Sequence, residues 1–196
     1  MSNTFVTSDV HLGHNNIIKY CNRPFQNSDE MDITIINNWN KIVNPDDEVY
    51  ILGDFALIKA ENDKLKFNRL CFLTNSLNGN KHLLFGNHDY FLDDDYINAG
   101  FKDVYHGILE INLSYHYWVM CHYQMVSWNN SSKGAYHLFG HEHWRQQYSP
   151  NHQFYKDMSW SERKFNVCMD ANNYKPVNIN DLVRILDKRP INFNKQ

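Results

Sequence analysis

Residues 48–54 read Glu-Val-Tyr-Ile-Leu-Gly-Asp, an apolar run that ends in a glycine and a carboxylate. Residues 81–89, Lys-His-Leu-Leu-Phe-Gly-Asn-His-Asp, repeat the pattern with a longer polar end. Runs of this length that are apolar throughout are typical of strands buried on both faces. The two stretches therefore indicate strands of one sheet that carry polar side chains at their carboxyl ends.

Segments with helical spacing follow the strand at residues 48–54 and an earlier strand at the start of the chain. Residues 28–43 and 59–77 place apolar side chains three and four positions apart, which predicts a helix after each of two strands. The first of these strands lies at residues 4–8 and leads directly to Asp9 and His11. Because strand and helix alternate, we expect a layered α/β domain.

The second half of the chain is predicted to be mostly β. We expect a hairpin formed by residues 104–113 and 115–121. Two further strands are expected at 135–139 and 165–168, and a closing helix at 180–188. The aromatic-rich segment 144–164 has no clear period and is either a long loop or a broken hairpin. No repeat or linker divides the chain, so we expect a single domain over residues 1–196.

Composition excludes several classes of protein. The 196 residues carry 19 Lys and Arg against 22 Asp and Glu, a formal charge of -3, so a basic face for long nucleic acid is not favoured. No apolar run spans a bilayer, and the first 25 residues lack a secretory pattern, so no membrane partner is expected. The four cysteines form no C-x-x-C pair, which suits reduced thiols. We expect a cytoplasmic protein.

Five polar clusters follow apolar runs along the chain. They are Asp9-Val10-His11, Gly53-Asp54, Gly86-Asn87-His88-Asp89, Cys121-His122 and Gly140-His141-Glu142-His143. The carboxyl ends of strands in an open α/β sheet meet at one crevice, so all five can contribute to one site. Residues i and i+2 of an extended chain face the same way, which would point Asp9 with His11, and His141 with His143, into it.

The clusters supply enough donor groups for two metal ions. The candidate ligands are three oxygen donors and four imidazoles: Asp9, Asp54, Asn87, His11, His122, His141 and His143. One ion cannot use seven side chains, but two ions about 3.5–4 Å apart can if one carboxylate bridges them. Imidazole and carboxylate without thiolate suit Mn, Fe, Zn, Co or Ni better than Ca or Mg.

The order D-x-H, G-D, G-N-H-D, H and G-H-x-H resembles the five signatures of the calcineurin-like metallophosphoesterase superfamily. Residues 9–18 and 170–176 are similar to stretches of its small bacterial and bacteriophage phosphoesterases. The resemblance spans most of the chain. It implies a four-layer α/β/β/α sandwich with the active site at the carboxyl ends of the strands.

The same resemblance implies a role for each group. Asp9, His11, Asp54 and His143 would hold the first metal, and Asp54, Asn87, His122 and His141 the second, so Asp54 would bridge them. His88 would stay unligated and give a proton to the leaving group. The implied cofactors are two divalent transition-metal ions, with manganese favoured, and the implied nucleophile is a hydroxide that bridges them.

The function implied is a phosphodiesterase that acts on a small nucleotide-like phosphoester. A nuclease or a phosphomonoesterase of the same family, or a catalytically silent binding or scaffold protein with this fold, are the alternatives. The protein-phosphatase branch carries a further Asp and an Arg after the G-D signature, whereas Asp54 is followed here by Phe55, Ala56 and Leu57. Hydrolysis of phosphoproteins is therefore not expected.

Three more polar residues have two readings each. His14 either faces the pocket and contacts phosphate or only begins a helix. Arg23 is a candidate phosphate contact, although a lone loop arginine is more often a surface ion pair. Asp89 either orients a neighbouring imidazole or caps the turn that follows it.

Overall fold

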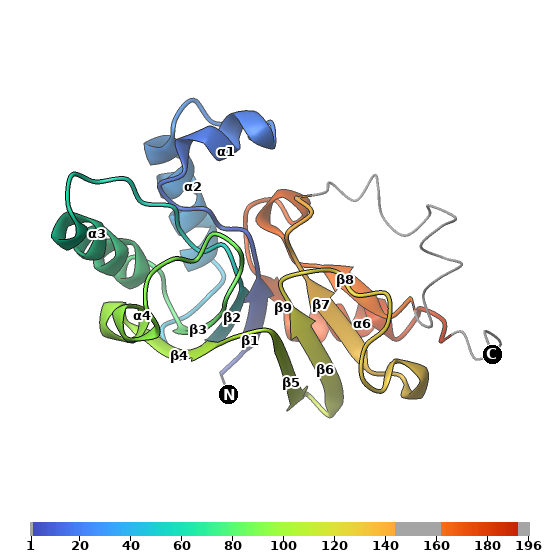
Figure 1. The fold of residues 1–196 in the computed structure, drawn as a ribbon. Coiled ribbons are helices and arrows are strands. Elements are labelled where there is room, and N and C mark those ends of the chain that lie inside the picture. Colours follow the sequence, from blue (N-terminus) through green and yellow to red (C-terminus); the bar gives the residue numbers. More distant parts are fainter. Residues whose placement is uncertain (1, 144–161, 192–196) are drawn as a thin grey trace.

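The computed structural model describes residues 2–143 and 162–191. The prediction for the aromatic segment 144–164 falls almost wholly outside these residues. Two sheets face each other, and helices cover the outer side of the first sheet (Figure 1). The predicted α/β sandwich is confirmed.

The first sheet has five strands in the order β4-β3-β2-β1-β9. Their bounds are β1 Thr4–Thr7, β2 Glu48–Leu52, β3 Asn80–Leu84, β4 Phe101–Tyr105 and β9 Val177–Asn178. β1 to β4 are parallel, and only β9 runs antiparallel to its neighbour β1. The carboxyl ends of β1, β2 and β3 therefore lie at one edge, as the sequence predicts.

Helices connect these parallel strands. They are α1 Asn15–Tyr20, α2 Ser28–Asn40, α3 Asp63–Asn75 and α4 Asp93–Ala99. α2 begins where the side chain of Asn27 accepts the N–H of Glu30, and Asn62 caps α3 in the same way. The two longer helices confirm the helical spacing, whereas α1 and α4, with six and seven residues, are too short to show a period.

Two cores explain why the strand at residues 48–52 is apolar throughout. Val49 and Ile51 pack among the helices, in a core that also contains Trp39. Tyr50 and Leu52 belong to the other core, between the two sheets. Because both faces of this strand are covered, every position from Val49 onward is buried.

The second sheet is mixed, in the order β5-β6-β7-β8. Its strands are β5 Ile108–Leu113, β6 His116–Cys121, β7 Tyr136–Phe139 and β8 Lys164–Asn166. β5 and β6 form an antiparallel hairpin, while β6, β7 and β8 are parallel. Trp118 and Met120 face the first sheet, and Val119 faces outward against Trp128 and Ala135.

The closing helix and two short 3-10 helices complete the described elements. α6 Ile179–Leu186 buries Leu182 and Leu186 in the core between the sheets. Asn178 caps it through the N–H of Asn180. The 3-10 helices are η1 Ser131–Lys133 and η3 Met169–Ala171. In the parts of the chain that the structure places, no helix is both long and apolar enough to cross a bilayer.

The prediction of one strand at residues 104–113 is wrong. β4 ends at Tyr105 in the first sheet, and β5 begins at Ile108 in the second. Gly107, with a φ of +76°, lies in the turn between them. The chain leaves one sheet for the other here, and apolar residues on both sides of the turn hide the change from a periodicity argument.

One buried histidine outside the clusters belongs to the packing of the second sheet. The N–H of Met125 donates to Nε2 of His137 at 3.0 Å, so the ring proton is on Nδ1, which donates to the carbonyl of Val119 at 2.9 Å. Burial lowers the pKa of His137 to about 4. Both ring nitrogens are therefore satisfied only in the neutral form.

This neutral imidazole predicts a pH-dependent stability. In the unfolded chain, His137 takes up a proton near pH 6.5. Its contribution to the unfolding free energy is therefore fully present above pH 6.5 and is lost as the pH falls toward 4. Between pH 7.5 and pH 5 the wild type should lose roughly 2 kcal/mol more unfolding free energy than His137→Gln. Urea denaturation of both proteins at the two pH values measures this. Equal losses would contradict the assignment.

Candidate metal centre

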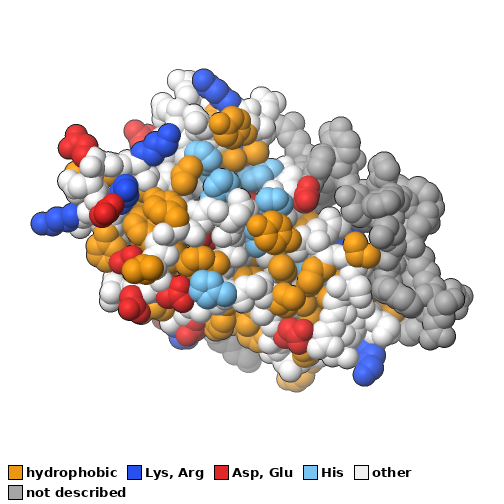
Figure 2. All heavy atoms as spheres, in the orientation of Figure 1, with side chains coloured by type: hydrophobic (Ala, Val, Ile, Leu, Met, Phe, Trp, Pro, Cys, Tyr) orange, Lys and Arg blue, Asp and Glu red, His pale blue; other side chains and the backbone are white. Residues whose placement is uncertain are grey.

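The five polar clusters meet at one edge of the molecule, as expected. They follow β1, β2, β3, β6 and β7, so both sheets contribute the carboxyl ends of parallel strands. Figure 2 shows pale blue histidine side chains gathered on this face of the molecule. Four of the seven candidate ligands are buried: Asp9, His11, Asp54 and His122. His141 and His143 are partly exposed, and Asn87 is exposed.

Asp9, His11, Asp54 and His143 form a first group of donor atoms. Nε2 of His11 lies 3.3 Å from Nε2 of His143 and 3.4 Å from Oδ2 of Asp54. Nε2 of His143 lies 3.5 Å from Oδ1 of Asp9. The four side chains therefore present one donor atom each toward a common point.

Asp54, Asn87, His122 and His141 form a second group. Nε2 of His122 lies 3.0 Å from Oδ1 of Asn87, 3.7 Å from Oδ2 of Asp54 and 3.3 Å from Nδ1 of His141. The same oxygen of Asp54 thus faces His11 in one group and His122 in the other. The sets that the resemblance implies are the sets that the fold brings together.

These spacings fit ligands of divalent transition metals. Bonds of about 2.0–2.1 Å from a metal to nitrogen or oxygen place neighbouring ligand atoms about 3.0–3.4 Å apart. Among the described residues, three trios keep their donor atoms within 4.8 Å of one another: Asp9 with His11 and His143, Asp9 with Asp54 and His122, and Cys21 with His143 and Asp170. The donors of the two groups themselves are imidazoles, carboxylates and the amide of Asn87, so these residues fit such ions.

Hydrogen bonds fix which imidazole nitrogen faces each group. Nδ1 of His122 donates to the carbonyl of Leu52 at 2.7 Å, which leaves Nε2 for the second group. Nδ1 of His143 donates to Oδ2 of Asp170 at 2.9 Å, which leaves Nε2 for the first. Such outer partners orient metal-binding imidazoles in proteins.

The two imidazoles of the first group have pKa values shifted in opposite directions. Burial, followed by the charges of His143 and Arg23, lowers the pKa of His11 well below its ordinary value. Burial also disfavours charge on His143, but its hydrogen bonds and the negative charge of Asp9 outweigh it and raise the pKa of His143 to about 10. Without a metal, this shift favours the protonated form of His143 beside the carboxylate of Asp9.

The backbone at the clusters is left-handed, not extended. φ is 55° at Asp9, 54° at His11, 56° at Asp54, 69° at His141 and 44° at His143. The expectation that i and i+2 face the pocket because the chain is extended is therefore wrong, although these side chains do converge. A left-handed residue costs about 1–2 kcal/mol, and such strain clusters at functional sites.

Asp89 supports the turn that carries Asp54. Its carboxylate accepts the backbone N–H groups of Asp54 at 2.7 Å, Phe55 at 3.0 Å and Gly86 at 2.8 Å. It neither orients an imidazole nor caps the turn that follows it. Three N–H bonds from two loops instead hold the ends of β2 and β3 together.

His14 and His88 lie beside the first group. Nδ1 of His14 is 3.3 Å from Nδ1 of His11, and His14 is also the N-cap residue of α1, without a hydrogen bond from its side chain to the cap. The exposed ring of His88 has its centroid 5.5 Å from that of His11 and 6.1 Å from that of His14. The backbone N–H of His88 donates to Oδ1 of Asp54 at 2.8 Å.

The prediction of Arg23 as a phosphate contact is wrong. Its side chain is fully buried. Its guanidinium donates to both carboxylate oxygens of Asp170 and to the carbonyls of Asp9 and Val10, and it also contacts the sulfur of Met31. All three nitrogens are thus engaged inside the protein, and none faces a substrate.

Two supporting residues were missed by the sequence reasoning. Asp170 pairs with Arg23 and His143, and Oγ of Ser8 donates to Oδ2 of Asp9 at 2.6 Å. Asp170 lies in the stretch 170–176 that carries part of the family resemblance, so that stretch contained a signal. Ser8 gives none, because a serine at the end of a strand has no distinguishing pattern.

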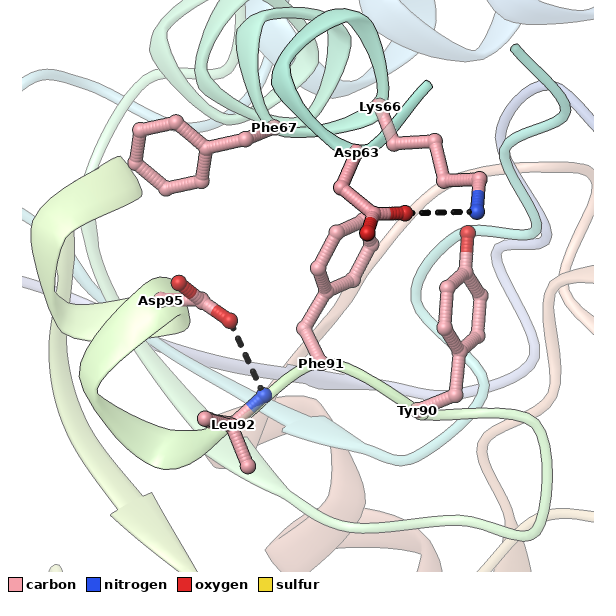
Figure 3. A pocket seen from close by; sticks show the side chains of 7 residues that line it. All are labelled: Asp63, Lys66, Phe67, Tyr90, Phe91, Leu92 and Asp95. Carbon is pink, nitrogen blue, oxygen red and sulfur yellow. Dashed lines mark hydrogen bonds and ion pairs between the residues drawn. The ribbon is translucent and has the colours of Figure 1, made fainter. Parts of the chain in front are cut away.

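The structure also contains a hollow near α3 and α4 (Figure 3). It has a volume of about 270 Å³ and lies between α3, the loop after His88 and α4. Its lining consists of Asp63, Lys66, Phe67, Tyr90, Phe91, Leu92 and Asp95. Lys66 pairs with Asp63 at 2.9 Å, and Asp95 accepts the N–H of Leu92. None of the predicted site residues lines it.

Comparison with known proteins gives a relative that matches nearly the whole chain. The uncharacterized protein MJ1445 of Methanocaldococcus jannaschii is 33% identical over 193 residues, which cover 96% of this chain and 93% of that protein. The chain belongs to the family of MJ1445. The Gene 66 protein of Mycobacterium phage L5 is 37% identical over 89 residues, 45% of this chain and 41% of the phage protein. No protein-family model matches the chain.

A solved structure of unknown function shares the fold. The protein of unknown function AQ665 from Aquifex aeolicus superposes with a TM-score of 0.70 at 21% identity, over 94% of this chain and 100% of AQ665. The Pseudomonas putida nuclease MPE overlaps less well, with a TM-score of 0.48 at 16% identity over 71% of this chain and 61% of its own. An archaeal phosphodiesterase gives a TM-score of 0.42 at 17% identity, over 73% of this chain and 74% of its own.

Gly140 provides a test of the first group. A Cβ at this position would overlap Oγ of Ser8 and Oδ2 of Asp9. We predict that Gly140→Ala weakens Mn²⁺ binding at least about tenfold, the smallest loss typical for disturbed support of a ligand. Calorimetric titration of the metal-free protein measures it.

Gly107→Ala is the matched control. Gly107 has a φ of +76°, so alanine is strained there, but nothing lies within 4 Å of the added Cβ. This variant should lose stability and keep its Mn²⁺ affinity. Equal affinities in Gly140→Ala and the wild type would contradict the placement of Asp9.

Proposed function

We propose that this chain is a two-metal phosphoesterase, and that it hydrolyses a small nucleotide-like phosphodiester with manganese as the favoured metal. The observation that carries the proposal is the position of Asp54. Its Oδ2 lies 3.4 Å from Nε2 of His11 and 3.7 Å from Nε2 of His122, so one carboxylate oxygen faces both donor groups. A carboxylate shared between two donor sets could hold two ions about 3.5–4 Å apart, the spacing of two-metal hydrolases.

Two divalent ions held there would neutralise charge on the phosphate oxygens and lower the pKa of a water molecule that attacks phosphorus. The side chains of the protein hold and orient these groups. Oδ1 of Asp54 accepts the N–H of His88, which turns its Oδ2 toward the two donor groups. The buried hydrogen bonds of His122 and His143 keep their Nε2 atoms directed inward.

His88 is the proposed proton donor. Its ring is exposed and lies beside the first group, and within the described residues no hydrogen bond from its imidazole is seen. It can therefore reach the leaving oxygen of a bound ester and protonate it. Burial and the charge of His88 lower the pKa of His14 to about 4, so its ring is neutral. We propose that this neutral ring contacts the phosphate.

The substrate class rests on charge. With a net charge of -3 the chain lacks the excess of basic residues that grips long nucleic acid, which favours a small phosphoester. We also propose that residues 1–196 form a single domain. The four free cysteines suit a reducing compartment, so the proposed location is the cytoplasm.

Hydrolysis of an activated bis-aryl phosphodiester tests the proposal. Metal-free protein should be inactive and should gain activity as about two Mn²⁺ ions bind per chain. Nucleotides, cyclic nucleotides and oligonucleotides in the same assay identify the substrate class. Turnover of oligonucleotides alone, falling steeply with salt, would replace the small substrate by a nucleic acid.

His88→Ala is the informative variant in this assay. It should bind two Mn²⁺ ions like the wild type and slow turnover by roughly 10²–10⁴-fold, because only the proton donor is lost. Loss of an ion in His88→Ala would make His88 a ligand instead. Binding of ions without hydrolysis of any ester by the wild type would favour a scaffold.

A further inference from the structure

The pair formed by Arg23 and Asp170 joins two distant parts of the chain beneath the first donor group. Nε of Arg23 donates to Oδ1 of Asp170 at 2.9 Å, and Nη2 donates to Oδ2 at 2.8 Å. The exposed fractions of the two side chains are 0% and 4%. This is a buried, two-point ion pair with fixed geometry.

The acidic end of the pair reaches a candidate ligand. Oδ2 of Asp170 accepts Nδ1–H of His143 at 2.9 Å. Because Nδ1 carries this proton, Nε2 is the nitrogen left to face Oδ1 of Asp9 and Nε2 of His11. Asp170 thus selects both the tautomer and the direction of the ring.

The basic end of the pair reaches the strained loop of the other ligands. Nη2 of Arg23 donates to the carbonyl of Asp9 at 2.8 Å, and Nη1 donates to the carbonyl of Val10 at 3.1 Å. Asp9 and His11 on either side of Val10 have left-handed backbones. Strained conformations persist only when surrounding contacts over-determine them, and these two hydrogen bonds are such contacts.

We propose that the Arg23–Asp170 pair positions the ligands of the first metal, by fixing His143 from one side and the loop of Asp9 and His11 from the other. The inference rests on the proposed two-metal function. A buried ion pair adds little net stability, because the loss of hydration offsets the attraction. The pair contacts two members of the donor group, His143 and Asp9, and also Val10, the residue before His11. These contacts point to positioning rather than to general support of the fold.

Asp170→Asn tests the proposal, with Asp47→Asn as its control. Asparagine keeps the size of Asp170 but removes the charge that fixes both His143 and Arg23. Asp47 is also a buried carboxylate that accepts two backbone N–H groups, from Asn3 and Asn44, but it precedes β2 at the opposite edge of the sheet. Each substitution removes one buried carboxylate, but only the first is near the donor group.

The experiment titrates Mn²⁺ into the metal-free full chain and follows heat, melting temperature and the electron paramagnetic resonance of coupled Mn²⁺ ions. In Asp170→Asn we expect one of two sites to weaken about 10–100-fold. The coupled signal should then appear only at higher Mn²⁺, and the rise in Tm on metal addition should shrink. Arg23→Lys keeps the charge but loses the two-point contact, so it should weaken the same site less than Asp170→Asn does. Asp47→Asn should lower Tm and change neither site.

The outcomes separate this proposal from the proposed function. Two undiminished sites in Asp170→Asn, with or without a lower Tm, would overturn the positioning role and leave the two-metal function intact. A wild type that binds no Mn²⁺ would overturn the function and the positioning role with it. If Asp170→Asn does not fold, Arg23→Lys decides, and wild-type affinity there overturns the proposal.

Discussion

One carboxylate, that of Asp54, must lie between two groups of donor atoms, and much of the surrounding structure serves to keep it there. Gly53 and Asp54 both have positive φ, so the chain turns sharply at the end of β2. Asp89 accepts the N–H groups on one side of this turn, and the N–H of His88 holds Oδ1. A Cβ at Gly86 would collide with Oδ1 of Asp54, so the absence of a side chain there is part of the same constraint.

The rest of the fold stabilises this local strain. Five left-handed residues at about 1–2 kcal/mol each amount to a substantial unfavourable energy in one region. Two apolar cores and the parallel pairing of β1, β2 and β3 fix the strands from which the strained loops emerge. The Arg23–Asp170 pair and Asp89 then hold the loops themselves. Packing sets the positions of the strands, and buried polar contacts set the positions of the donor groups.

Much of this arrangement can be predicted from the sequence, because it follows from pattern and order. The apolar runs before Asp54 and Asn87 predict strands, and parallel strands bring their ends together whatever their distance along the chain. The left-handed conformation of Asp9 and His11 could not be predicted in this way, since an extended chain accounts for the same spacing. Nor could the partner of Arg23, because 147 positions separate it from Asp170 and only the fold brings them into contact. The step from β4 to β5 was missed for a related reason: hydrophobicity alone does not show which sheet a strand joins.

Anomalous X-ray scattering from a crystal grown with Mn²⁺ would test the central role of Asp54 most directly. We expect two Mn²⁺ peaks about 3.5–4 Å apart, with the Asp54 carboxylate in contact with both. A single peak, or two peaks of which only one contacts Asp54, would contradict it.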